Sequence, residues 1–117
     1  MISIGTDIVE LNRVRKALSD SFMRLTLSED EIVKANTFSE ERRVQFVSGR
    51  FAAKEAIIKA LTDYEVPLMK DLNIVNNEKG KPEIEYKDYI IHLSISHERN
   101  YATAVAVLDG FKERNEE

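Results

Sequence analysis

The sequence predicts an α+β domain in which an antiparallel sheet packs against one long helix. Residues 40–61 hold a single glycine and no proline, which predicts the helix. Residues 2–9 alternate and are rich in β-branched side chains, as strands are. Residues 90–95 and 101–108 repeat that pattern around a short polar turn, which predicts a hairpin.

The remaining segments fit the same architecture. We expect the first strand to be interrupted at Gly5, and residues 11–18 to form a short helix, because their apolar residues recur at helical spacing. Residues 28–31 have the spacing of a capping box, which predicts the start of another helix. Residues 72–75 predict a short strand, and the polar run at residues 76–81 predicts a turn.

The long helix carries an apolar seam that is broken at one place. Its members are Val44, Val47, Phe51, Ile58 and Leu61. The spacing requires an apolar residue at position 54 or 55, where the chain has Lys54 and Glu55. Charged groups at the edge of a core are costly unless they are paired or bound, so a function is expected here. The alternative is an exposed ion pair between Glu55 and Lys59, four residues apart.

Two further polar residues interrupt predicted strands. Asp7 is either a turn residue or a partner of Glu55, because Mg²⁺ is typically held by one or two carboxylates, waters and substrate phosphates. His97 ends a strand, where it is either simply exposed or a donor to a phosphate oxygen. The serines before His97 do not indicate a serine hydrolase, because the Gly-x-Ser-x-Gly elbow is absent.

Composition limits the classes of function. The 117 residues suit one domain, residues 1–117, and the net charge of −4 argues against a nucleic-acid partner. The absence of cysteine excludes disulfides, zinc–thiolate sites and cysteine nucleophiles. We expect a cytoplasmic protein without a membrane partner, because the sequence shows no signal peptide and no apolar run of about 20 residues.

Basic residues form two groups that suit anionic partners. Those along the long helix are Arg42, Arg43, Arg50, Lys54 and Lys59, and they supply cations near one groove. Those near the start of the chain are Arg13, Arg15, Lys16 and Arg24. A solvated helix face explains some of them, but it does not explain the broken seam.

Four blocks resemble the motifs of the holo-acyl-carrier-protein synthases, the AcpS type of 4′-phosphopantetheinyl transferase. They are IGTDIVEL at residues 4–11, GRFAAKEAIIKA at 49–60, NEKGKP at 77–82 and SISHERNYA at 94–102. The blocks follow the order of the family and cover nearly the whole chain. One departure is that the family commonly has a glycine shortly after the second block, where this chain runs through residues 60–63 without one.

The resemblance implies the transferase fold as a single half and Mg²⁺-dependent transfer of 4′-phosphopantetheine. The donor is coenzyme A, the acceptor is a serine of apo acyl carrier protein, the by-product is 3′,5′-ADP, and the product serves fatty acid biosynthesis. The implied catalytic residues are Asp7, Glu55, Lys59 and His97, of which Asp7 and Glu55 bind the metal. The implied coenzyme A contacts are Arg42, Arg43, Arg50, Lys59, Gly80, Lys81, Pro82 and His97. The resemblance also implies a homotrimer with active sites between subunits, and a docking helix for the carrier protein with Arg13, Arg15, Lys16 and Arg24.

Two other functions remain open from the sequence. A binding module of the same fold would hold a nucleotide or a carrier protein without transferring anything, and a trimeric interaction domain would not bind coenzyme A. The sequence leaves open whether Glu55 or a bound water takes the serine proton. It also leaves open which carrier protein is used, and which subunit supplies which residue.

Overall fold

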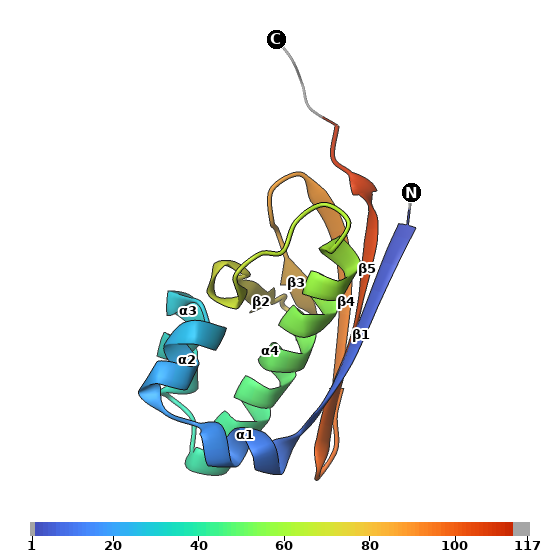
Figure 1. Ribbon diagram of the computed structural model, residues 1–117. Helices are drawn as coiled ribbons and strands as arrows, with labels where there is room; N and C mark the ends of the chain where they lie inside the picture. Colours follow the sequence, from blue (N-terminus) through green and yellow to red (C-terminus); the bar gives the residue numbers. More distant parts are fainter. Residues whose placement is uncertain (1, 114–117) are drawn as a thin grey trace.

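The computed structural model describes residues 2–113 of the chain. In chain order the elements are β1 (Ile2–Glu10), α1 (Leu11–Ala17), α2 (Asp20–Thr26), α3 (Glu29–Ala35), α4 (Glu40–Leu61), the 3₁₀ turn η1 (Met69–Asp71), β2 (Ile74–Asn76), β3 (Pro82–Ile84), β4 (Tyr89–His97) and β5 (Tyr101–Phe111). β1, β5 and β4 form an antiparallel sheet in that order, and β2 pairs with β3. α4 lies along one face of the three-stranded sheet, and the short helices lie on the other side of α4 (Figure 1). The predicted fold class is confirmed.

Gly5 does not interrupt the first strand, contrary to our expectation. β1 is continuous, and residues 2–10 all pair with β5. Gly5 is instead the point where β1 and α4 make their closest approach. A Cβ atom at this position would lie 1.9 Å from the carbonyl oxygen of Ala56 and 2.8 Å from the backbone nitrogen of Ala60. The glycine is therefore required for helix–sheet packing.

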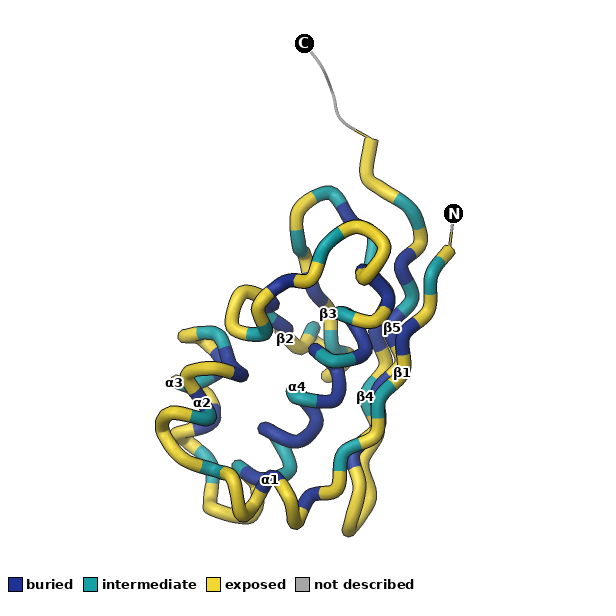
Figure 2. The backbone as a smooth tube through the Cα atoms, viewed as in Figure 1, coloured by how far each residue is buried: buried dark blue, intermediate teal, exposed yellow. Residues whose placement is uncertain are grey.

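The face of α4 that meets the sheet is built from small residues. They are Ala52, Ala53, Ala56 and Ala60, and all are buried. The predicted seam is partly wrong: Ile57 is fully buried, whereas Phe51 and Ile58 are only partly buried. Figure 2 shows α4 as the most continuously buried element. Small side chains let the helix axis lie close to the strands, which rotates the buried face away from the row of large residues.

The N-terminal helices depend on capping residues. Ser28 accepts a hydrogen bond from the backbone of Glu31, whose side chain caps Ser28 in return, so the predicted capping box is confirmed. α2 was missed, although Ser19 caps it by accepting from the backbone of Phe22. The signal was present in the sequence, because a serine followed by an aspartate is a common helix start.

Several strand boundaries differ from the predicted ones. The strand expected at residues 72–75 is β2, which begins at Ile74, because residues 72–73 connect it to η1 and are not part of the strand. β3 was not predicted, and β4 and β5 are each longer than expected. β5 continues past Gly110 to Phe111, and residues 114–117 lie outside the described residues.

The connection that lacks the family glycine is anchored by Glu65. Its carboxylate accepts hydrogen bonds of 2.7 Å from the hydroxyl of Tyr86 and 2.7 Å from that of Tyr89, and of 2.9 and 3.0 Å from Lys87 Nζ. Thr62 Oγ1 also donates to the carbonyl of Ile58, 2.8 Å away, at the helix end. The segment after α4 is thereby fixed to the β3–β4 connection without a glycine.

This anchor predicts an acid-sensitive contribution to stability. The hydrogen bond from Lys87, with those from Tyr89 and Tyr86, lowers the pKa of Glu65 from 4.5 to about 2. A carboxylate with a lowered pKa in the folded state stabilises the fold above pH 4.5, and this contribution is lost as the pH falls toward 2. Urea unfolding should therefore show that Glu65→Gln is less stable than the unmodified protein at neutral pH. The difference should shrink in acid.

The control for this prediction is Glu85→Gln, at an exposed carboxylate of the same β3–β4 connection. Its stability should match that of the unmodified protein across the same pH range. A stability difference for Glu65→Gln that stays constant down to about pH 2 would contradict the role of the charge.

Candidate active site

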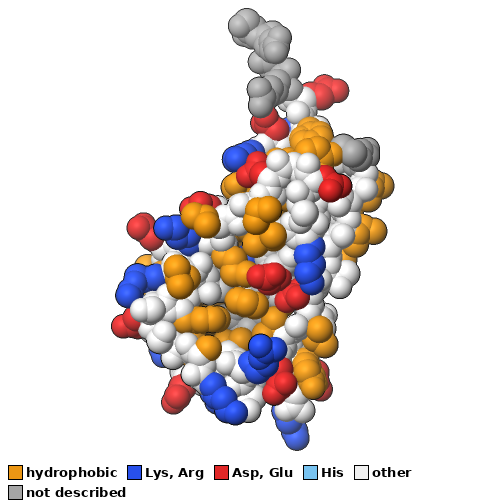
Figure 3. Space-filling model, in the orientation of Figure 1, with side chains coloured by type: hydrophobic (Ala, Val, Ile, Leu, Met, Phe, Trp, Pro, Cys, Tyr) orange, Lys and Arg blue, Asp and Glu red, His pale blue; other side chains and the backbone are white. Residues whose placement is uncertain are grey.

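The first cavity of interest has a volume of about 430 Å³ and lies between β1, α1, α2 and α4. Asp7 and Glu55 both line it, as does Arg13 from α1. Phe22 and Phe51 form part of its apolar wall, with their stacked rings 5.9 Å apart. Figure 3 shows this face, where acidic, basic and hydrophobic side chains meet in a hollow beside β1. Two acids that are distant in the chain therefore reach one cavity.

The alternation of β1 explains the position of Asp7. Gly5, Asp7 and Val9 lie on the strand face toward α4, whereas Ile4 and Ile8 are exposed on the other face. Only 17% of the Asp7 side chain is exposed. The carboxylate is thus held against the helix that carries Glu55.

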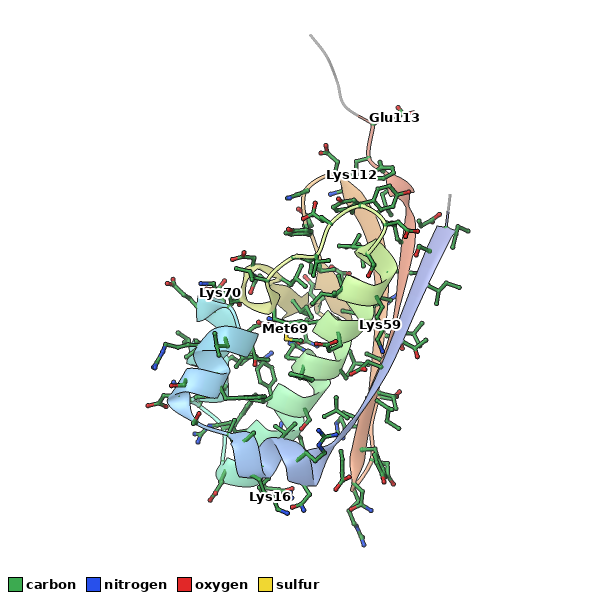
Figure 4. The ribbon with its side chains drawn as sticks, viewed as in Figure 1. Lys16, Lys59, Met69, Lys70, Lys112 and Glu113 are labelled. Carbon is green, nitrogen blue, oxygen red and sulfur yellow. The ribbon has the colours of Figure 1, made fainter. Side chains whose placement is uncertain are left out.

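Lys59 contacts Asp7. Its Nζ donates to Asp7 Oδ1 at 3.2 Å and to the carbonyl of Thr6 at 2.9 Å. Figure 4 labels Lys59 on the side of α4 that faces β1. The sequence left open an exposed ion pair between Glu55 and Lys59. Within residues 2–113, Lys59 instead forms its ion pair with Asp7.

The donor set of the first cavity suits a hard divalent cation. Within residues 2–113 no group of three or more His, Cys, Asp or Glu side chains is arranged to hold a metal ion. Asp7 and Glu55 offer only carboxylate oxygens. Mg²⁺ is commonly bound by one or two carboxylates, with waters and substrate phosphates completing its octahedron. The pair therefore fits Mg²⁺ with a phosphate substrate, and does not form a complete protein site.

A second cavity, of about 420 Å³, lies on a different side of α4. The predicted coenzyme A contacts that line it are Arg42, Arg50, Gly80, Pro82 and His97. Lys34 adds another cation. Gly80 adopts a φ of 84°, which the β2–β3 turn requires and which glycine tolerates. Chain segments separated in sequence thus combine into one basic cavity with a turn as its wall.

Other predicted residues lie outside the second cavity. Arg43 donates to the backbone carbonyls of Ala35 and Phe38, at 3.0 and 3.2 Å, and so holds the α3–α4 connection. Lys81 lines a separate pocket beside β4. Lys54 was expected among the groove cations, but it is fully buried and belongs to an internal ion pair. That pair is one reason for the broken seam.

The predicted docking residues are not equivalent. Arg13 lines the first cavity, whereas Arg15 donates to both carboxylate oxygens of Glu41, at 2.8 and 3.0 Å. Arg24 contacts the hydroxyl of Ser21 at 3.4 Å. Lys16 is exposed at the end of α1, where Figure 4 labels it. Arg13 is therefore the only one of the four whose side chain lines the same cavity as the two acids.

Sequence reasoning missed Glu31 as more than a capping residue. Its side chain is 2% exposed and pairs with Lys54 and Arg50 of α4. The capping-box spacing identified the residue but not its burial. A charged partner for Lys54 could have been sought, because a buried lysine requires one.

Comparisons with known proteins identify the family of the chain. The family model described as the 4′-phosphopantetheinyl transferase superfamily matches residues 3–106, so the chain belongs to this superfamily. Holo-[acyl-carrier-protein] synthase of Oceanobacillus iheyensis is 42% identical over 112 residues, covering 91% of this chain and 94% of that protein. The enzyme of the same name from Bacillus cytotoxicus is 44% identical over 115 residues, covering 93% and 96%.

Solved structures place the chain in the same group. A holo-(acyl-carrier-protein) synthase from Bacillus anthracis, in complex with CoA (3′,5′-ADP), matches with a TM-score of 0.82 and 41% identity over 91% of this chain and 94% of that one. The synthase of Neisseria meningitidis matches with a TM-score of 0.82 and 28% identity over 94% and 100%. The prediction of an enzyme of the holo-[acyl-carrier-protein] synthase type is confirmed.

Proposed function

We propose that the chain transfers 4′-phosphopantetheine from coenzyme A to a serine of apo acyl carrier protein, with Mg²⁺, and so activates a carrier for fatty acid biosynthesis. The observation that carries the proposal is the meeting of Asp7 and Glu55 in one cavity with Arg13 at its side. The bound CoA (3′,5′-ADP) in the Bacillus anthracis relative supports the donor. We treat residues 1–117 as one transferase domain, because the family model spans residues 3–106.

The side chains in and beside the first cavity would have separate roles in the reaction. The carrier serine oxygen bonds to the β-phosphorus of coenzyme A, the bond from that phosphorus to the oxygen of 3′,5′-ADP breaks, and the serine proton passes to Glu55 or to a water. Mg²⁺ held by Asp7 and Glu55 would neutralise charge on the pyrophosphate. Lys59 lines a separate pocket that Asp7 also borders, and from there its ammonium group holds the Asp7 carboxylate in place.

The second cavity would bind the nucleotide end of coenzyme A. Arg42 and His97 offer donors to its phosphates, and the Gly80–Pro82 turn offers a wall for the base. The two cavities share no lining residue. The metal site and the nucleotide site therefore lie on different sides of α4. One coenzyme A molecule would reach both if two subunits lay side by side.

We further propose that the chain forms a homotrimer with active sites between subunits. The outer face of the three-stranded sheet supports this, because Ile4, Ile8 and Val105 are 63%, 64% and 42% exposed on it. Contiguous exposed apolar side chains on a sheet face are typical of an interface. Sedimentation equilibrium should give three times the mass of the chain. A monomer at working concentrations would contradict the assembly.

The test of the transfer itself uses mass spectrometry. An apo acyl carrier protein incubated with the chain, coenzyme A and Mg²⁺ should gain the mass of 4′-phosphopantetheine and release 3′,5′-ADP. Addition of a chelator should stop the gain. A chain that binds coenzyme A by calorimetry but leaves the carrier mass unchanged would instead be a binding module, and the proposal would be wrong.

Arg13→Glu is expected to weaken carrier binding. Arg13 lies in the first cavity on the helix implied to meet an acidic partner, so reversing its charge should raise KM for the carrier by about tenfold and change kcat little. Steady-state kinetics with varied carrier concentration measure this. The control is Lys70→Glu, which makes the same charge change at an exposed residue of η1. Equal KM values for the two variants would place the docking surface elsewhere.

A further inference from the structure

Glu31 is the most highly connected buried acid within residues 2–113. Oε1 accepts from the backbone nitrogen of Ser28 at 2.8 Å and from Lys54 Nζ. Oε2 accepts from the backbone nitrogen of Ile74 at 3.3 Å and lies 3.3 Å from Arg50 Nε. One carboxylate therefore joins α3, α4 and β2.

This burial exceeds what helix capping needs. A capping box works with an exposed glutamate, whereas the Glu31 side chain is 2% exposed and Lys54 is fully buried. Burial lowers the pKa of Lys54 and of Arg50, and the charge and hydrogen bond of Glu31 oppose that shift. Buried ion clusters add little net stability compared with apolar packing, so their retention points toward a positional role.

The cluster continues outward to the second cavity. Arg50 Nη2 donates to Asn76 Oδ1 at 2.6 Å, and Asn76 Nδ2 donates to the carbonyl of Gly80 at 2.9 Å. The Arg50 guanidinium also lies over the ring of Phe46, 4.7 Å from its centre. Arg50 thus forms an ion pair with Glu31 through Nε and donates a hydrogen bond to Asn76 through Nη2.

The cluster also reaches the helix segment that carries Glu55. Lys54 Nζ donates to the carbonyls of Thr26, at 2.8 Å, and Met69, at 3.0 Å, as well as to Glu31. These three acceptors use all three of its protons. Figure 4 labels Met69 beside α4, on the side where the short helices lie. The Lys54 side chain is therefore fixed, and so is the rotation of α4 about its own axis.

We propose that Glu31 is a positioning residue for coenzyme A: through Arg50 and Asn76 it sets the β2–β3 turn that forms the wall of the second cavity. The inference rests on the proposed function and adds a residue to it. Glu31 does not touch the substrate, because its carboxylate is enclosed by protein groups. It acts through the fork of Arg50 and the amide of Asn76.

The test compares coenzyme A affinity in two variants at opposite ends of the link. Glu31→Gln removes the charge that faces Arg50, and Asn76→Ala removes the outer link at an exposed position and leaves every contact of Glu31 in place. Calorimetry should show about tenfold weaker binding of coenzyme A in each, the loss expected for one hydrogen bond to a charged group. KM for coenzyme A should rise to match, while KM for the carrier and kcat change less than about twofold.

The double variant separates a shared link from two independent contacts. If Glu31 acts through Asn76, the double variant should bind coenzyme A no more weakly than the weaker single variant. Additive losses would overturn the proposal. So would a Glu31→Gln defect spread equally over kcat and both KM values, since that describes a general structural loss.

Controls keep the outcome interpretable. Glu29→Gln removes an exposed acid from the first turn of the same helix and should leave coenzyme A binding unchanged. If Glu31→Gln does not fold, Asn76→Ala decides, and unchanged coenzyme A affinity in that variant overturns the proposal. If the unmodified protein itself does not bind coenzyme A, the proposed function fails, and this inference fails with it. If the unmodified protein and both variants all bind coenzyme A normally, this inference is wrong and the proposed function stands.

Discussion

Asp7→Asn and Glu55→Gln should each lower kcat for phosphopantetheine transfer by about 10²- to 10³-fold, the loss typical of removing one group that stabilises transition-state charge. Both changes keep the shape of the side chain and remove one charge from the first cavity, which both acids line. The measurement is carrier mass gain against time at saturating coenzyme A and carrier. Higher Mg²⁺ concentration should partly restore the Asp7→Asn rate, because weakened metal binding responds to mass action.

The fold should survive both changes. Within residues 2–113 the ion pair of Asp7 is with the exposed Lys59, and Glu55 lines a cavity at the surface. Thermal unfolding should therefore stay close to that of the unmodified protein. The control is Glu85→Gln, a remote exposed acid that should keep full activity. A loss of turnover of less than about threefold in both site variants would be too small for groups that stabilise the transition state. That result would remove the metal pair from the mechanism.

Gly5→Ala should be the most destabilising small substitution in the sheet. The added methyl would sit 1.9 Å from the carbonyl oxygen of Ala56, and the three nearest atoms all belong to the backbone of α4, so no side chain can move aside. Separating β1 from α4 would open the core between them, with an expected loss of about 3 kcal/mol in the free energy of unfolding. Urea unfolding monitored by circular dichroism measures this loss.

Gly49→Ala is the matched comparison on the helix itself. A methyl at Gly49 would lie 3.3 Å from Cγ2 of Ile95, a tight contact with a side-chain atom and not with backbone. The tight contact is offset by the gain of about 1 kcal/mol from replacing glycine by alanine within a helix. The net change should stay within about 1 kcal/mol. A Gly5→Ala variant as stable as Gly49→Ala would mean that β1 and α4 do not pack as closely as the structure shows.

A Gly5→Ala variant that does fold should also lose activity. Asp7 is two residues further along the same strand face, and Glu55 precedes Ala56, the residue whose carbonyl oxygen the new methyl meets. The same close approach that packs the core therefore brings the two carboxylates to one cavity. We therefore expect stability and the proposed metal binding to depend on one contact.

The sequence by itself determined most of the architecture. The lack of proline over residues 40–61 specified α4, the alternation of apolar residues specified β1 and the β4–β5 hairpin, and the capping box specified where α3 begins. These signals are local, because a cap or an alternating strand involves neighbours within four positions. The pairing of Asp7 with Glu55 was predicted by combining a resemblance with the chemistry of Mg²⁺, and the structure brings both acids to one cavity.

Tertiary structure alone decided what each charge does. Lys54 and Glu55 are adjacent in sequence, yet Lys54 is buried against Glu31, 23 positions away, while Glu55 lines a cavity. Lys59 contacts Asp7, 52 positions away, and Gly5 is required because α4 crosses β1 there. The physical reason is that the cost of a charge or a methyl group depends on which atoms surround it, and those atoms come from distant segments that meet only in the folded chain.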